Sequence, residues 1–320
     1  MQGNMTYLDA TVAAHIKAFL ALDSLVALLT IVGNCIFMAT LMKKSRLHTP
    51  SNMLLGALCV SDIFIGIAVQ PLWIIEFSSF LNDKPFEKLS LIKRTLTLVC
   101  VGLSFQFLGL VSVDRYTAIC HPFMYFAKAT CRTHIHISII IVFLNAVFYG
   151  LFFIIPAYER KRITFLITCM LSILIIFCNI MILKTLLKTR RQLVKVGDFL
   201  RTQSTEAIAN VSMSRRKQSS RQTKERNKTH VIMIIMLLFF ICYSPWLIQN
   251  ALALWKLDAF KTSTDFVFSE IWTDFLLLVN SFVNPLIYYS RIKEIRMAAK
   301  EVLCRRKEFN VHLSSSYSQS

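Results

Sequence analysis

The chain has 320 residues, of which 55% are hydrophobic and 12% aromatic, and its formal net charge at pH 7 is +18. With a mean hydropathy of +0.55, this composition excludes an ordinary soluble domain. The basic residues gather in alternate segments between long apolar runs, as they do in the cytoplasmic loops of membrane proteins, and this pattern argues against a nucleic-acid-binding protein.

Seven apolar runs are each long enough to cross a bilayer, for which a helix needs about 20 residues. They cover residues 17–42, 51–77, 91–119, 134–156, 163–187, 229–254 and 266–289. The first run is preceded by a polar segment and is itself long enough to span, so no cleaved signal peptide is expected. The predicted fold is an all-α membrane protein whose seven-transmembrane helix bundle covers residues 17–289.

The segments before and between the runs have distinct compositions. Residues 1–16 form a predicted extracellular tail, in which Asn4 begins an Asn-X-Thr sequon and is a candidate for glycosylation. Residues 189–228 are rich in Arg, Lys, Ser and Gln, which predicts a flexible, basic third cytoplasmic loop. The alternation of basic loops places the N-terminus outside the cell and the C-terminus in the cytoplasm.

The segment after the seventh run alternates apolar and basic residues at helical spacing. This pattern predicts an amphipathic helix over residues 290–305 that lies on the inner membrane face. Cys304, near its end, is a candidate for palmitoylation. Residues 306–320 form a predicted cytoplasmic tail whose serines are candidates for phosphorylation.

Polar residues inside the apolar runs need a reason, because a charge at the bilayer centre costs at least about 2.5 kcal/mol on insertion scales. Asp62 lies near the middle of the second run and is expected to face the bundle interior. Polar atoms at a similar depth come from Asn34, Ser104, Asn280, Ser281 and Asn284. Such a cluster suits a water network or a Na⁺ ion; the alternative is that these residues only join helices by hydrogen bonds. No other cofactor is predicted. The helix-breaking residues expected to kink their helices are Pro71, Pro245 and Pro285.

Groups of residues on five runs, taken together, form a family signature. In order they are Asn34; Leu58 with Asp62; Asp114-Arg115-Tyr116; Phe239 with Cys242-Tyr243-Ser244-Pro245; and Asn284-Pro285-Leu286-Ile287-Tyr288. This set resembles the rhodopsin-like (class A) G-protein-coupled receptors over residues 17–305. A short second extracellular loop without a cysteine and a fifth run without proline are similar to the melanocortin receptors, and the stretch from 284 to 304 is similar to the melanocortin and adenosine group.

The resemblance implies a plasma-membrane receptor that activates a heterotrimeric G protein, with arrestin as a further candidate partner. It implies that Arg115 pairs with Asp114 and Glu225 in the resting state, and that an agonist opens the cytosolic face and exposes Arg115. The remaining residues of this predicted activation switch are Tyr116, Phe239, Tyr243, Pro245, Asn284, Pro285 and Tyr288.

Several positions depart from the family pattern. Ser90 stands where the family usually has the cysteine of a disulfide, and Asn145 stands where the fourth helix usually has a tryptophan. Met181 replaces a usual tyrosine of the fifth helix, and Tyr243 replaces the usual tryptophan of the sixth. The proline and the tyrosine that the fifth helix lacks belong to the family's activation relay, so raised basal activity is a hypothesis.

The ligand does not follow from the resemblance. Thr97 stands where an amine receptor has an aspartate, Leu278 stands where an opsin has its lysine, and the acidic cluster of melanocortin receptors is absent. Lys93 and Arg94 are expected at the outer mouth of the pocket, where they suit an anionic lipid or a small acid; a peptide is a further candidate, and interfacial snorkelling is the alternative role for both. The predicted ligand-binding residues are Glu76, Lys93, Arg94, Thr97, Trp246, Gln249, Asn250 and Asp274.

A transporter, an enzyme and a decoy receptor are the alternatives to a signalling receptor. A seven-helix transporter is disfavoured, because no internal repeat is present and Asp62 is the only clear acid at the midplane. An enzyme is not expected, because no nucleophile and base pair, metal-ligand spacing or phosphate-binding glycine loop occurs. A non-signalling or decoy receptor is the main alternative.

Overall fold

A computed structural model describes the backbone of residues 2–82, 87–151, 155–201, 208–254 and 264–304. Side chains are described within narrower limits, chiefly 10–79, 90–151, 159–189, 231–252 and 268–304. The predictions for the side chains of Asn4 and Glu225, and for the tail after residue 304, lie outside these limits.

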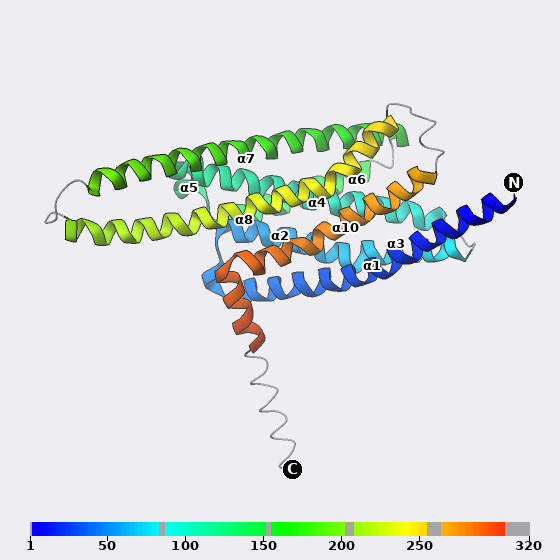
Figure 1. Cartoon of the computed structure of the whole chain (residues 1–320), viewed down its shortest axis with the longest axis horizontal. Coiled ribbons are helices and arrows are strands. Elements are labelled where there is room, and N and C mark those ends of the chain that lie inside the picture. Colours follow the sequence, from blue (N-terminus) through cyan, green and yellow to red (C-terminus); the bar gives the residue numbers. More distant parts are fainter. Residues whose placement is uncertain (1, 83–86, 152–154, 202–207, 255–263, 305–320) are drawn as a thin grey trace, which may run out of the picture.

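Long helices lie side by side along the longest axis of the molecule (Figure 1). In chain order they are α1 (Gln2–Lys43), α2 (Pro50–Phe64), α3 (Gln70–Leu81), α4 (Glu87–Cys120), α6 (Cys131–Leu151), α7 (Ala157–Arg201), α8 (Ile208–Leu254) and α10 (Thr264–Arg291). The short helices η1 (Ser45–Leu47) and α5 (Pro122–Lys128) lie in connections. Residues 293–304 form a last helix that turns away from the bundle (Figure 1).

Within the described part of the chain, seven spans have the length and hydropathy needed to cross a membrane. They are Ala10–Lys43, Pro50–Ser79, Ser90–Cys120, Cys131–Leu151, Glu159–Thr189, Val231–Leu252 and Phe268–Arg291. The predicted all-α bundle of seven transmembrane helices is confirmed, and the described residues form no strand. The chain is therefore a multi-pass helical membrane protein.

The second span is built from α2 and α3, which are joined by a π-helical turn, η2 (Ile65–Val69). Pro71 has no backbone N–H to donate to the preceding turn, and a widened turn directly before it is one way for a helix to accommodate this loss. At Gly66, an added Cβ would lie 2.7 Å from Cγ1 of Ile31, so the missing side chain lets α1 approach the widened turn closely. The irregularity is therefore packed into the bundle.

The helices α7 and α8 continue well beyond the membrane spans as a neighbouring pair (Figure 1). Most of residues 189–228, for which the sequence predicts a flexible loop, are helical in the structure. Lysine, arginine and glutamine are good helix formers, which suits the extension of the two helices over these residues.

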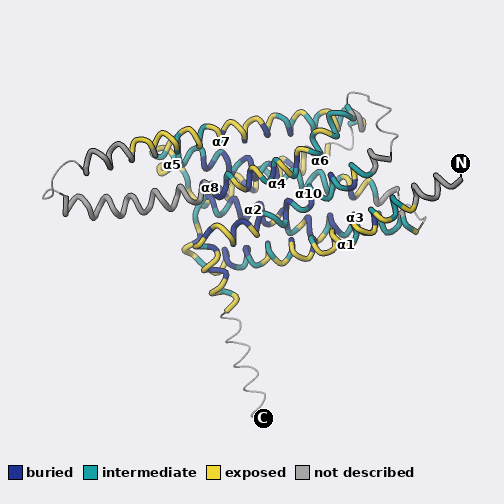
Figure 2. Tube along the Cα trace, viewed as in Figure 1, coloured by how far each residue is buried: buried dark blue, intermediate teal, exposed yellow. Residues whose placement is uncertain are grey.

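Buried residues lie toward the middle of the bundle and exposed residues on its outer faces (Figure 2). Many of the exposed residues are apolar. Phe143, Met170 and Ile173 are 65%, 71% and 67% exposed. Apolar side chains on the outside suit contact with lipid tails. We refer to the two ends of the bundle as the Arg115 end and the Lys93 end, after a residue of α4 near each.

Candidate functional site

A buried ion pair lies near the Arg115 end of α4. Arg115 donates to Oδ2 of Asp114 from Nε at 3.0 Å and from Nη2 at 2.6 Å. Ser51 of α2 donates to the same oxygen at 2.5 Å, and the hydroxyl of Tyr125 of α5 donates to Oδ1 at 3.0 Å. Burial and the nearby charge of Asp114 raise the pKa of Tyr125, which keeps this hydroxyl protonated as a donor. Asp114 therefore joins three helices and holds Arg115 against its own helix.

His134 of α6 completes the surroundings of Asp114, and the sequence analysis missed it. Its Nε2 lies 2.9 Å from Oδ1 of Asp114, and its Nδ1 lies 2.9 Å from the carbonyl oxygen of Thr130. Both ring nitrogens face acceptor oxygens, so both hydrogen bonds form together only when the imidazole carries two protons. A polar residue early in an apolar run was the one available signal, and it did not reveal the partner.

Glu225 and Tyr116 are two further members of the predicted switch. The backbone of Glu225 belongs to α8, but its side chain is outside the described limits, so its pairing with Arg115 stays a prediction. The hydroxyl of Tyr116 lies 3.2 Å from Nε2 of His121, and the two rings meet edge to face. Tyr116 is thus held near the start of α5.

An aromatic stack joins α4 to α8 in the middle of the bundle. The ring centroid of Phe105 of α4 lies 4.9 Å from that of Phe239 and 5.1 Å from that of Tyr243, with nearly parallel planes. Tyr243 in turn contacts Trp246 at a centroid distance of 5.1 Å. A displacement of α8 along or away from α4 must break this stack.

The polar cluster around Asp62 is assembled largely as predicted. Asn284 donates to Oδ2 of Asp62 at 2.9 Å, and Ser104 donates to Oδ1 at 3.3 Å. Asn34 donates to the carbonyl oxygen of Ser281 at 3.1 Å and so joins α1 to α10. Asn280 is buried beside them and lines a small cavity with Ser104 and Ser281.

The oxygen atoms of this cluster determine which kind of cation could bind there. Among the described residues, no three carboxylate, histidine or cysteine side chains come together as a metal site. One carboxylate with hydroxyl and carbonyl oxygens suits a monovalent ion better than a divalent one. Asn284 turns its amide N–H toward Asp62, so it donates a hydrogen bond to the carboxylate and presents no ligand oxygen on that side.

A second buried acid lies between α1 and α3. Asp23 accepts a hydrogen bond from Nε2 of Gln70 at 2.7 Å, and both residues are fully buried. The other oxygen of each side chain has no partner among the described residues. The sequence analysis did not single out Asp23, which lies in the first membrane span among apolar neighbours.

At the Lys93 end, a cavity of about 400 Å³ is lined by all eight predicted ligand-binding residues. We call it the outer cavity. Lys93 is 4% exposed, pairs with Glu76 and lies 3.5 Å above the ring centroid of Trp73. Its charge is therefore held inside the bundle and does not snorkel. Arg94 is exposed, and Trp73 donates to the hydroxyl of Thr97 at 3.2 Å.

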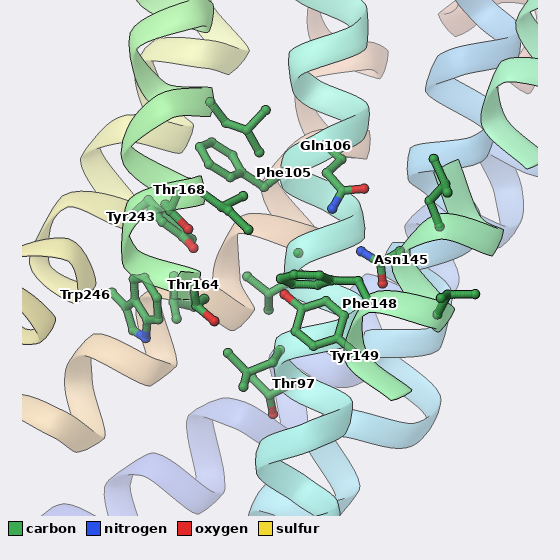
Figure 3. Close-up of a pocket in the computed structure, with 18 of the residues that line it drawn as sticks. Thr97, Phe105, Gln106, Asn145, Phe148, Tyr149, Thr164, Thr168, Tyr243 and Trp246 are labelled. Carbon is green, nitrogen blue, oxygen red and sulfur yellow. The ribbon is translucent and has the colours of Figure 1, made fainter. Parts of the chain in front are cut away.

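A second cavity, of about 450 Å³, lies between α4, α6 and α7 and is closed by Tyr243 and Trp246 of α8 (Figure 3). We call it the inner cavity. It shares five lining residues with the outer cavity: Thr97, Leu98, Tyr149, Thr164 and Trp246. An added Cβ at Gly102 would lie 2.7 Å from the hydroxyl oxygen of Tyr149, so the glycine makes room for this ring beside α4. The two cavities therefore meet below the outer mouth.

Comparison with known proteins agrees with this architecture. The family described as "7 transmembrane receptor (rhodopsin family)" matches residues 33–288. Melanocortin receptor 5 of Mus musculus is 22% identical over 296 residues, which are 90% of this chain and 84% of the relative. Trace amine-associated receptor 5 of Mus musculus is 26% identical over 301 residues, 87% of this chain and 82% of the relative. Olfactory receptor 10H4 of Homo sapiens is 33% identical over 114 residues, 35% of each chain.

Seven apolar helices whose interior contains buried polar clusters define an integral membrane protein with the architecture of a receptor. The family match covers most of the seven spans, and the chain belongs to the rhodopsin family of seven-transmembrane receptors. The predicted class A resemblance and its melanocortin-like character are confirmed. Members of this family are receptors and not enzymes, and signalling through a G protein is typical of them.

Proposed function

We propose that the protein is a plasma-membrane receptor that converts binding of an extracellular ligand into activation of a heterotrimeric G protein. Its N-terminus is extracellular and its C-terminus cytoplasmic, so the Arg115 end faces the cytosol. The network around Asp114 carries this proposal. It links α2, α4, α5 and α6 around a buried ion pair, which is costly to desolvate unless all of its partners are in place. The helices can therefore switch between a state in which the network is formed and one in which it is broken.

In this proposal the structure is the resting state. Arg115 is 3% exposed, so a G protein reaches it only when the neighbouring helices separate. α8 is expected to move, because Pro245 interrupts its hydrogen bonds within the span. Glu225, nearer the start of α8, is the proposed resting partner of Arg115. Asn284, Pro285 and Tyr288 of α10 are proposed to support the open state.

The proposed ligand site is the outer cavity, whose described lining carries four basic and three acidic residues. Lys93 is neutralised by Glu76, whereas Arg94 is exposed beside the cavity. An anionic lipid or a small acid is therefore the proposed ligand class. A peptide is the second candidate, because Glu270 and Asp274 also line the cavity and relatives include melanocortin receptors. Trp246 would pass the signal to Tyr243 through their ring contact.

Nucleotide exchange on a panel of G-protein α subunits tests this proposal. Wild-type receptor in lipid nanodiscs is compared with Arg115→Ala, with and without anionic lipids, small acids and melanocortin peptides. Exchange that requires Arg115 supports the receptor and identifies its G protein. Absence of exchange on every subunit, from receptor shown to be folded in the nanodiscs, supports the decoy receptor instead. Arrestin recruitment by the tail is a further proposal, which is tested in cells that express the receptor.

A further inference from the structure

The inner cavity contains an unsatisfied polar group in apolar surroundings. Asn145 of α6 is 2% exposed, lines the cavity, and neither its amide nitrogen nor its amide oxygen has a partner among the described residues. Buried amides are nearly always hydrogen-bonded, because an unpaired one loses its bonds to water without replacement. Gln106 of α4 lines the same cavity, and Figure 3 shows both amides beside the space between α4 and α6.

The rest of the lining defines what kind of molecule fits. The described residues around the inner cavity include no charged side chain, and most are aliphatic or aromatic. Its volume of about 450 Å³ lies within the range typical of small-molecule sites. An ionised group would be desolvated there without a counter-charge, so the occupant is uncharged. The Asn145 amide offers one acceptor and two donor hydrogens, which favours a partner that both donates and accepts.

The inner cavity is open toward the bilayer. Leu144, Val147 and Leu151 of α6 line it and are nevertheless 57%, 45% and 53% exposed. α4 packs against both α6 and α7, whereas α6 and α7 barely touch within the described part of the chain. The opening therefore lies between α6 and α7, on a face that lipid tails contact. A molecule dissolved in the bilayer can enter there without crossing the outer cavity.

We propose that the inner cavity binds an uncharged single-chain lipid whose head group donates and accepts hydrogen bonds, and that this lipid enters from the bilayer between α6 and α7. The head group pairs with Asn145, and the chain fills the apolar space against Tyr243 and Trp246. Binding at this site does not require G-protein coupling. A regulatory effect of the lipid does rest on the proposed function, because Tyr243 belongs to the stack that joins α4 to α8.

Photolabelling of the full chain in nanodiscs tests the binding. The probe is a long-chain primary fatty amide with a diazirine on its chain, and the competitor is the same amide without the diazirine. In wild type we expect saturable labelling of residues on α4, α6 or α7 around the inner cavity. Asn145→Leu keeps a similar volume but removes the amide, and it is expected to weaken binding of the amide probe at least about fivefold, because both hydrogen bonds to the head group are lost. The methyl ester of the corresponding fatty acid only accepts hydrogen bonds, so its affinity should fall less in this variant.

A second variant, at an exposed position, is needed in case Asn145→Leu impairs folding. Leu144→Trp places a large ring at the exposed mouth and is expected to block labelling, whereas Ile140→Trp lies on the same helix, is 55% exposed and does not line the cavity. Labelling that persists in Leu144→Trp, or that is equal in Asn145→Leu and wild type, overturns the proposal. So does labelling confined to outward-facing positions and not displaced by competitor, which would mark ordinary boundary lipid. None of these readouts involves a G protein, so they fail or succeed independently of the proposed function.

Discussion

His134 of α6 lies with its Nε2 2.9 Å from Oδ1 of Asp114, the acid that also holds Arg115. The fourth membrane span thus makes a direct contact with the proposed switch. The outer cavity lies near the opposite end of α4, where Lys93 and Thr97 line it. The contact between His134 and Asp114 is therefore far from the proposed ligand site. Changes in α6 can therefore bias the switch without touching the ligand site.

We expect His134→Ala to raise basal nucleotide exchange and to lower the melting temperature of the receptor. The substitution removes one donor from Asp114, and a hydrogen bond to a charged group contributes ~1.5–3 kcal/mol. Arg115 is then less firmly held in the resting state. His136→Ala, at an exposed position on the same helix, is the matched control. A lower melting temperature with unchanged, Arg115-dependent exchange would make His134 a packing contact and not part of the switch.

Low pH is expected to release the helix of residues 293–304 from the connection after α1. Lys44 and Arg46 donate to the carboxylate of Glu301 at 2.6 and 2.7 Å and hold its pKa below the ordinary value of 4.5. A group with a lowered pKa stabilises the folded arrangement above its unfolded pKa, and this stabilisation is lost as the pH falls through the folded value. The change therefore occurs below about pH 4.5 and is small, because the pair is exposed and salt screens it.

Spin-label distances between the two segments at pH 7 and pH 3.5 measure this release. The Glu301→Gln variant should show the same distance distribution at both pH values, and 1 M NaCl should mimic part of the effect in wild type. A wild-type distribution that does not respond to pH would show that apolar contacts alone dock the helix.

Sodium is expected to stabilise the wild type but not Asp62→Asn. The cluster offers one carboxylate and neutral oxygens, which suits a monovalent cation, and Na⁺ that binds only the folded state raises its melting temperature by mass action. Melting in NaCl is compared with melting in choline chloride at equal ionic strength. A sodium-dependent shift that survives in Asp62→Asn would place the ion elsewhere, and no shift in wild type would leave the cluster as a hydrogen-bonded contact between helices.

The sequence predicts the properties of single helices well, but it predicts contacts between helices poorly. Hydropathy located the seven spans, because a helix that contacts lipid tails must itself be apolar along its length. The polar cluster at Asp62 was also predictable, since an acid at mid-depth must face inward. His134 and Asp114 lie 20 positions apart on different spans, and only the rotation of α6 against α4 brings them together. Asn145 was noticed as a departure from the family pattern, but a single substituted position does not show that a cavity lies beside it.

Asp23→Asn is expected to leave the melting temperature unchanged or to raise it. In wild type Asp23 accepts one hydrogen bond from Gln70, and the second oxygen of each side chain is buried without a partner in the described structure. An asparagine keeps the first bond and supplies a donor to the free oxygen of Gln70, while it removes the cost of burying a carboxylate. Asp23→Leu, which leaves Gln70 unpaired, should lower stability by ~1–3 kcal/mol. If Asp23→Asn proved as harmful as Asp23→Leu, the acid itself would have a role beyond this contact.

The pair of Lys93 and Glu76 permits a test that separates folding from ligand binding. Lys93→Met leaves Glu76 without its partner in a half-buried position, and removal of one member of a buried pair typically costs ~3–5 kcal/mol. The double variant Lys93→Met with Glu76→Gln carries no unpaired charge and should recover most of the lost stability.

Ligand potency in the double variant then reports the role of Lys93 itself. If an anionic ligand displaces Glu76 and pairs with Lys93, potency should fall at least about tenfold although the receptor is stable again, and Arg94→Ala should reduce it further. Potency that returns together with stability would limit Lys93 to holding α3 against α4, and would leave the exposed Arg94 as the group to which an anionic head group binds.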